Sequence, residues 1–255
     1  RDLCPANPVT RYTLTIHNPS PVTDSVSTLP TPQTPSTPTA RLILKRGKEE
    51  SLMRFHPWVF SGAIYRMEGS PAEGDLVDVY TSERQFIARG HYQIGSITVR
   101  VLSFAEEAID QRWWNARIRA AYRMREALGL AENPQTTCYR LVHGEGDSLP
   151  GLVVDIYGRT AVIQCHSVGM YRSRKAIGEA LREVFGDRLT ALFDKSGGTL
   201  PYNAGLGAQD GYLWGEPAKT ENPVLENGCL FRVNWEQGQK TGFFIDQREN
   251  RELVR

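Results

Sequence analysis

The sequence predicts an α+β fold of more than one domain, in which a small β-barrel precedes an α+β layer. Three observations support this prediction. Apolar residues begin to recur only at Arg41, after a long Pro-, Thr- and Ser-rich stretch. Four short strand-like runs then follow without a helix of useful length between them. Helical and strand patterns alternate after that. The expected parts are residues 1–40, 41–109, 110–235 and 236–255.

Residues 1–40 make a poor folding segment. From His17 to Ala40 the chain is mostly Pro, Thr and Ser. Such a composition buries too little apolar surface to offset the entropy lost on ordering. We therefore expect a disordered, polyproline-like arm. It is either a flexible tether or an extension without a role, and the second interpretation is favoured.

Residues 41–109 contain four predicted strands with β-branched residues and turn signals between them. The strands are RLILKRG (41–47), DLVDVY (75–80), FIARGHY (86–92) and TVRVLSF (98–104). Unpaired strand edges invite association, so we expect a barrel that closes its own edges.

The next part, residues 110–235, begins with a helix. Asp110 is the expected N-cap, and Gly129 is the expected stop after Leu128. The expected buried face consists of Trp114, Ile118, Ala121 and Leu128. The other face carries Arg112, Arg119 and Arg123, flanked by Arg117 and Arg125. A solvated face is the favoured interpretation of these arginines, and phosphate contact is the alternative.

Strands and a second helix complete this part. The expected strands are 139–143, 152–158, 160–166, 190–196 and 229–235, and the expected helix is 169–186. Their order predicts one helix packed on a mostly antiparallel sheet. Glu145 and Asp147 lie in the loop GEGDSLPG, where a polar turn is favoured over a role in docking. Asp246 and Glu249 have the spacing of a capping box that opens a last helix.

Composition excludes several classes of protein. No apolar run approaches the roughly 20 residues that span a bilayer, so we expect no membrane association. The 4 cysteines are scattered, which argues against a disulfide scaffold and a metal site and favours a reducing cytoplasm. GLGAQDG (205–211) and GQKTG (238–242) lack the context of nucleotide-binding loops.

An RNA-binding surface is predicted near the first strands, although the formal net charge is only +1. The segment RFHPWVFSGAI (54–64) places aromatic residues beside cations, a combination that stacks bases and pairs phosphates. Trp58 and Phe60 are expected to fill a small core instead. The expected RNA contacts are Lys45, Arg46, Arg54 and His56.

Three ordered motifs resemble one family. HPWVFSGAI (56–64) is similar to the start of the PUA domain in large-subunit ribosomal RNA cytosine methyltransferases. RLVHGEGDSLPGLVVDIYG (140–158) resembles that family's central domain, and GQKTGFFIDQRENR (238–251) resembles its linker into the catalytic domain. The resemblance covers residues 41–255.

The resemblance implies a PUA-type barrel that binds rRNA, an α+β central domain, and the first residues of a Rossmann-like methyltransferase domain. Such enzymes use S-adenosyl-L-methionine to form 5-methylcytosine, after a cysteine thiolate adds to the pyrimidine ring. None of the cysteines matches that nucleophile, so the catalytic residues are expected beyond Arg255. The linker residues implied to border the cofactor are Lys240, Thr241, Gly242, Phe244, Asp246, Gln247 and Arg248. A structural hinge is an equal alternative for this stretch.

Two rival interpretations remain open. A free-standing PUA-type RNA-binding protein would lack enzyme activity, and the sequence after Arg255 would distinguish it from a methyltransferase. An accessory of a pseudouridine synthase would share the PUA domain but does not explain the motif at 238–251. The sequence leaves the oligomeric state open, a homodimer included.

The chain should bind RNA without turnover, because no catalytic cysteine is recognised within it. Incubation with rRNA and methyl-labelled S-adenosyl-L-methionine is expected to give no labelled RNA. Transfer above background would contradict this expectation.

Overall fold

The computed structural model describes residues 37–201, 205–216 and 222–254 of the chain. Residues 1–36 of the predicted arm (1–40) lie outside the described residues. The first strand of the described residues begins at Ala40, one residue before the predicted start. No helix of the described residues is long and apolar enough to cross a membrane.

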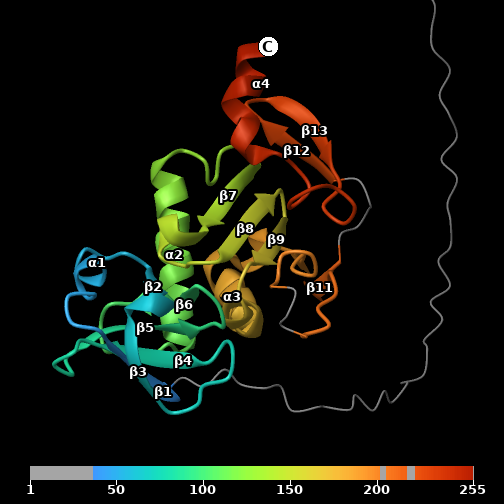
Figure 1. The fold of residues 1–255 in the computed structure, drawn as a ribbon. Coiled ribbons are helices and arrows are strands. Elements are labelled where there is room, and N and C mark those ends of the chain that lie inside the picture. The colour runs from blue at the N-terminus through green and yellow to red at the C-terminus, as the bar shows by residue number, and fades with distance from the viewer. Residues whose placement is uncertain (1–36, 202–204, 217–221, 255) are drawn as a thin grey trace, which may run out of the picture. The chain divides into compact units, whose positions relative to one another are not determined.

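The first sheet has six strands in the order β2-β6-β5-β4-β1-β3 (Figure 1). All four predicted strands are present, and two short strands were missed. The elements are β1 (Ala40–Leu44), α1 (Glu50–Met53), β2 (Trp58–Phe60), η1 (Ser61–Ala63), β3 (Ile64–Glu68), β4 (Leu76–Tyr80), β5 (Phe86–Tyr92) and β6 (Ile97–Ser103).

The prediction of a barrel that closes its own edges is not met by backbone pairing. β2 and β3 stand at the two ends of the strand order, and within the described residues they do not pair with each other. They are joined through η1, where the Lys45 N–H donates to the Ala63 carbonyl at 2.9 Å. β1 also pairs in parallel with β4, while the other pairings are antiparallel. Instead, β2 pairs with β6 and β3 pairs with β1, so the two strands on either side of η1 join opposite ends of the sheet.

The second sheet has five strands in the order β11-β10-β9-β8-β7. Only the β9–β10 pair is parallel, so the prediction of a mostly antiparallel sheet is confirmed. The strand predicted at 229–235 does not belong to this sheet, because it pairs in a separate two-stranded sheet. The elements are α2 (Gln111–Ala127), β7 (Cys138–His143), η2 (Gly144–Asp147), β8 (Leu152–Tyr157), β9 (Thr160–Cys165), α3 (Val168–Phe185), η3 (Gly186–Arg188), β10 (Ala191–Asp194) and β11 (Gly211–Trp214).

The last described elements form a small hairpin and a short helix. β12 (Asn222–Glu226) pairs antiparallel with β13 (Cys229–Val233). η5 (Ile245–Gln247) then leads into α4 (Arg248–Val254). The hairpin packs on the second sheet through a cluster that includes Tyr157, Val162, Val224 and Trp235.

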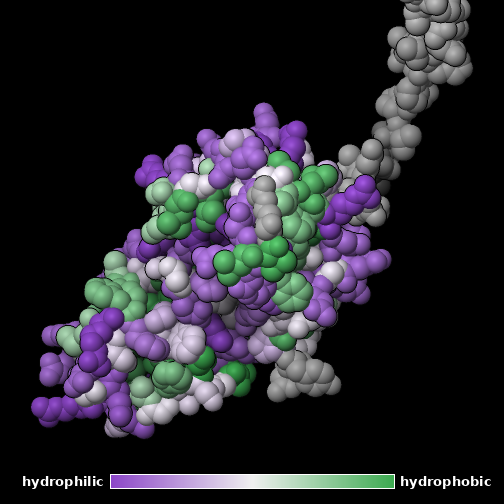
Figure 2. All heavy atoms as spheres, turned by 90° about the horizontal axis from the view of Figure 1, so that it is seen from above, coloured by the Kyte–Doolittle hydropathy of each residue, from purple (hydrophilic) through white to green (hydrophobic). Residues whose placement is uncertain are grey.

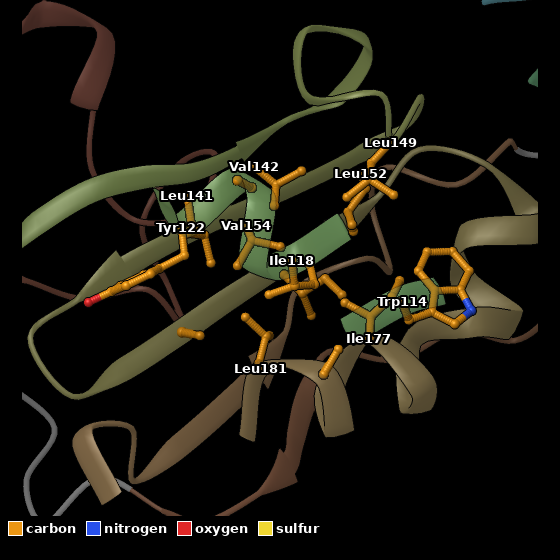
Figure 3. Close-up of a cluster of buried hydrophobic side chains, with 14 of the residues drawn as sticks. Trp114, Ile118, Tyr122, Leu141, Val142, Leu149, Leu152, Val154, Ile177 and Leu181 are labelled. Carbon is orange, nitrogen blue, oxygen red and sulfur yellow. The ribbon is translucent and has the colours of Figure 1, made fainter. Parts of the chain in front are cut away.

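Two helices cover the second sheet, where the sequence predicted one. Figure 3 shows Trp114 and Ile118 of α2 beside Ile177 and Leu181 of α3. All four side chains are buried against the sheet, with residues such as Val154. Asp110 caps α2 as predicted, because its carboxylate accepts the Trp113 N–H at 3.0 Å.

The C-terminal end of α2 departs from the prediction. Gly129 has φ +67° and ends the helix as expected. Leu128, however, is 64% exposed and does not belong to the buried face. Arg125, predicted to flank a solvated face, is buried and forms a two-bond ion pair with Asp147. Arg125 follows Ala121 by four positions and Ile118 by seven, so it lies on the buried face of the helix, where it meets Asp147 of η2.

The two sheets meet at a buried junction around His91 of β5. Leu76 and Leu102 of the first sheet belong to the same buried cluster as the α2 and α3 residues. The imidazole of His91 stacks on Trp114 with a centroid distance of 6.5 Å. Gly169 of α3 lies so close that an added Cβ would stand 2.1 Å from His91 Cγ. Only glycine permits this approach.

Burial of His91 should make the fold sensitive to acid. Desolvation lowers the pKa of its imidazole to about 3, with Arg100 and Arg172 contributing. The unfolded chain would bind a proton near pH 6.5. Stability should therefore be constant above that pH and fall between about pH 6.5 and pH 3, by up to about 3 kcal/mol at pH 4.

Urea unfolding at pH 7 and pH 4 measures this loss. His91→Phe should flatten the dependence on pH, because it keeps the ring and removes the titration. The exposed His56→Phe serves as the matched control and should leave the dependence unchanged. An equal acid sensitivity in the wild type and in His91→Phe would contradict the assignment.

Candidate nucleic-acid interface

The predicted cations lie on the surface around α1. Lys45, Arg46, Arg54 and His56 are all exposed. Lys45 Nζ donates to the Gly62 carbonyl at 2.9 Å, which fixes the side chain but leaves its charge without a carboxylate. Within the described residues, neither Arg46 nor Arg54 has an acidic partner. The structure thus brings three uncompensated cations to the segment between β1 and β2.

An aromatic strip lies beside these cations. His56, Trp58 and Phe60 are in mutual contact, with centroid distances of 5.7–6.2 Å. The prediction that Phe60 fills a core is wrong, since its side chain is 47% exposed. Val59 is buried instead, because neighbouring residues of a strand face opposite sides. Trp58 is half-buried, so a core role holds for it only in part.

Trp58 links the aromatic strip to the second sheet. Its Nε1 donates to Glu145 Oε1 at 2.9 Å. Glu145 thus has the docking role that the sequence disfavoured, whereas Asp147 stabilises the turn itself. The Asp147 carboxylate pairs with Arg125 and accepts the His143 N–H at 2.6 Å.

A small cavity of about 190 Å³ opens next to Glu145. Arg100, His143 and His166 line it together with Gly144 and Gly151 of the GEGDSLPG loop. Burial lowers the pKa of the Arg100 guanidinium, and it also lowers the pKa of His166. Arg100 Nη1 donates to Gln93 at 2.8 Å. The cavity therefore offers donors and one carboxylate at the end of the aromatic strip.

The linker residue Thr241 is part of a buried polar network. It is fully buried, and its hydroxyl lies 2.8 Å from Tyr157 Oη and donates to Asp155. Asp155 is also fully buried and accepts two hydrogen bonds from Arg140, at 2.8 and 3.0 Å. Burial raises the pKa of Tyr157, so its hydroxyl stays neutral. This network fastens the linker to β7 and β8.

The other linker residues divide into two groups. Lys240, Phe244, Asp246 and Gln247 are exposed. Lys240 Nζ lies 3.2 Å from Asp246 Oδ1 and 4.5 Å from the centre of the Phe244 ring.

Arg248 and Gly242 are held by the protein instead. Arg248 donates to the Cys138 carbonyl at 2.7 Å and pairs with Glu226. Gly242 has φ +120° and packs so tightly that an added Cβ would lie 2.6 Å from Trp235 Cα. Gly242 therefore cannot carry a side chain in this fold.

The predicted capping box is not formed. Asp246 lies within η5, and its carboxylate accepts hydrogen bonds from Lys240 and Gln247. The helix begins two residues later, at Arg248. The ion pair with Lys240 occupies the side chain that would have capped the helix.

None of the described cysteines is poised as a nucleophile. Cys138 and Cys165 are buried, and desolvation raises the pKa of both thiols, that of Cys138 to about 11. Cys229 is half-buried in β13. Among the described residues, no group of His, Cys, Asp and Glu could hold a metal ion. Cys4 lies outside the described residues.

A cleft of about 480 Å³ separates the end of α2 from η5 and α4. The apolar residues Met124, Leu128 and Ile245 line it beside Arg140 and Arg248. Met124 is 55% exposed, and hydrophobic side chains form separate patches on an otherwise mostly hydrophilic face in Figure 2. The linker thus borders an open, partly apolar cleft.

A family model for a PUA-like domain matches residues 42–104. This range covers β1 to β6, the aromatic strip and the exposed cations. Residues 42–104 form a PUA-like domain. The predicted boundaries of the parts that follow it stay a prediction.

Most of the chain is similar to curated proteins named as ribosomal RNA methyltransferases. It is 37% identical over 219 residues to ribosomal RNA large subunit methyltransferase I of Erwinia tasmaniensis, which is 85% of this chain and 54% of the relative. The Klebsiella pneumoniae protein of the same name is 38% identical over 84% of this chain and 53% of its own. The resemblance predicted from three motifs is confirmed. The chain spans about half the length of these relatives.

Solved structures support the fold. A protein of Streptococcus mutans, described as a candidate SAM-dependent methyltransferase, superposes with a TM-score of 0.69 at 23% identity. The match covers 84% of this chain and 53% of that one. A second structure, described as a candidate methyltransferase complexed with SAH, has the same TM-score at 22% identity. At this identity the likeness concerns the arrangement of the backbone.

Sequence reasoning missed the groups that hold this region together. It did not assign roles to Arg100, Arg140 or Asp155, which are single charged residues within apolar strands. Such a charge within a buried strand requires a partner, and that requirement could have marked Asp155. The identity of its partner depends on strand register and could not be read from the sequence.

Thr241→Val should lower the free energy of unfolding by about 1–3 kcal/mol, because it leaves the buried Asp155 carboxylate and the Tyr157 hydroxyl one partner short. Thr241→Ser keeps the hydroxyl and is the matched control. Urea unfolding measures both variants. A Val variant as stable as the wild type would show that the network does not fasten the linker.

Proposed function

We propose that the chain is the RNA-binding portion of an S-adenosyl-L-methionine-dependent methyltransferase that forms 5-methylcytosine in large-subunit rRNA. The supporting observation is the 37% identity over 85% of the chain to a ribosomal RNA large subunit methyltransferase I. The PUA-like domain is consistent with an RNA substrate. A stand-alone PUA-type RNA-binding protein without enzyme activity is the alternative.

The RNA-binding role rests on the surface around α1. Lys45, Arg46 and Arg54 are exposed and lack carboxylate partners, so they can neutralise phosphates at little desolvation cost. His56 and the neighbouring Trp58 and Phe60 supply ring surface for unstacked bases. The cavity at Arg100 and Glu145 offers both donors and an acceptor beside this surface.

The linker residues differ in what they could offer to S-adenosyl-L-methionine, which would supply the methyl group. Lys240, Phe244, Asp246 and Gln247 are exposed and could border the cofactor or the target base. Thr241 and Arg248 are engaged by buried groups of the protein. We therefore assign them the task of holding the linker in place, together with Gly242.

The chemistry of methyl transfer is not assigned to any described residue. The buried thiols of Cys138 and Cys165 have raised pKa values, which disfavours the reactive thiolate. We propose that the described part binds and orients RNA.

Replacing Lys45, Arg46 and Arg54 together by Ala should weaken RNA binding and flatten its salt dependence. Each phosphate contact that is lost reduces the slope of log K against log salt concentration by roughly 0.7–0.9. Fluorescence anisotropy across a salt series with a labelled rRNA fragment measures both quantities.

Replacing Arg112, Arg119 and Arg123 of α2 by Ala removes the same charge and provides the matched control. Arg112 and Arg119 already have acidic partners, so this variant should bind like the wild type. If both triple variants lose the same RNA affinity, the loss reflects net charge and not a specific surface. If the salt slope of the variant at Lys45, Arg46 and Arg54 is unchanged, these residues do not belong to the interface.

A further inference from the structure

The turn after α1 presents an aromatic side chain in a position that favours glycine. Phe55 follows the end of α1 and has φ +61°. Its N–H donates to the Leu52 carbonyl at 2.9 Å, and the His56 N–H donates to the Ser51 carbonyl at 3.0 Å. These two bonds form a Schellman helix end, whose left-handed residue is usually glycine. A Cβ there crowds the following carbonyl.

The fold gains little from the phenylalanine at this position. The side chain of Phe55 is 72% exposed. Its ring meets Phe104 at a centroid distance of 5.2 Å with the planes at 87°, so it makes an edge contact and leaves most of its surface in solvent. A bulky residue in the left-handed region is uncommon and costs free energy that glycine would not. Strained backbone conformations, such as a bulky residue in the left-handed region, cluster at functional sites.

The surroundings of Phe55 favour nucleic acid as the ligand. Arg54 precedes it in the chain, and Arg46 and Lys48 lie in the exposed turn before α1. Met53 adds a second exposed apolar side chain, at 67%. A solvent-exposed ring among cations is the combination by which proteins hold single-stranded nucleic acid, since each base offers a flat face and each linkage a charge.

We propose that Phe55 stacks on an unpaired base of the RNA while Arg46 and Arg54 contact the flanking phosphates. This inference rests on the proposed RNA-binding function and adds a ligand class to it. The base must be unpaired and unstacked, because the faces of bases within a duplex are covered by their neighbours. The left-handed backbone directs the side chain outward in the free protein, so the turn needs little rearrangement when RNA binds.

The test uses the full chain with a short fluorescein-labelled single-stranded RNA of mixed sequence and a blunt duplex of the same sequence. Phe55→Gly should weaken binding to the single strand by at least about fivefold. Its Tm should equal or exceed that of the wild type, because glycine relieves the left-handed strain. The salt dependence of RNA binding by Phe55→Gly should stay that of the wild type, since no charge is removed.

Two further variants serve as controls. Phe55→Tyr keeps the ring and should bind within about twofold of the wild type, whereas Phe55→Leu keeps only the apolar bulk and should bind like Phe55→Gly.

Three outcomes would overturn the inference. If Phe55→Gly binds the single strand within about twofold of the wild type, Phe55 is not part of the interface. If the Tm of Phe55→Gly is below that of the wild type, the contact between Phe55 and Phe104 is structural. If Phe55→Gly loses as much affinity for the duplex as for the single strand, Phe55 does not stack on an unpaired base. A wild-type chain that binds neither RNA would instead contradict the proposed function itself.

Discussion

A buried carboxylate determines how the C-terminal part of this protein is fixed. Asp155 lies in the middle of β8 with no exposed surface, and an unpaired charge at that depth would not be tolerated. Arg140 from the neighbouring strand supplies two hydrogen bonds, and Thr241 supplies another from far along the chain. Because Thr241 must reach that site, the segment that contains it lies against the sheet. Trp235 stacks on Tyr157 at 6.0 Å beside it and completes the attachment. The exposed residues Lys240 and Asp246 are thereby held at the surface, next to the cleft below α4.

The contact between the two sheets depends on the packing of buried side chains. It is an apolar packing surface in which the His91 ring lies between Trp114 and the backbone at Gly169. Polar contacts surround it: Trp58 donates to Glu145, and Arg172 pairs with Asp75 at 3.0 Å. The polar contacts fix the orientation and contribute little free energy, because exposed ion pairs are worth little. The aromatic strip and the cavity at Arg100 are therefore held in a defined relation to each other.

The surface that we propose to face RNA depends on local backbone geometry more than on packing. β2 is only three residues long, so its alternation buries Val59 and turns its two aromatic neighbours outward. In the turn after α1, the left-handed backbone conformation of Phe55 likewise places its ring on the surface. Both devices place rings on the surface at a cost in stability, and neither is needed by the core of the PUA-like domain, which Leu42, Val79 and Val99 fill.

The sequence by itself determined many of the elements and the family resemblance, although it missed β2, β3, β11 and β12. The strands at 75–80, 86–92 and 98–104, the cap at Asp110 and the three ordered motifs depend on local patterns, which neighbouring residues specify. Tertiary structure decided the rest. The open ladder between β2 and β3, the burial of Arg125 and the exposure of Leu128 each depend on which distant segments pack against them. A buried charge can be suspected from its apolar neighbours, but Arg140 and Thr241 become the partners of Asp155 only once strand register and chain path are fixed.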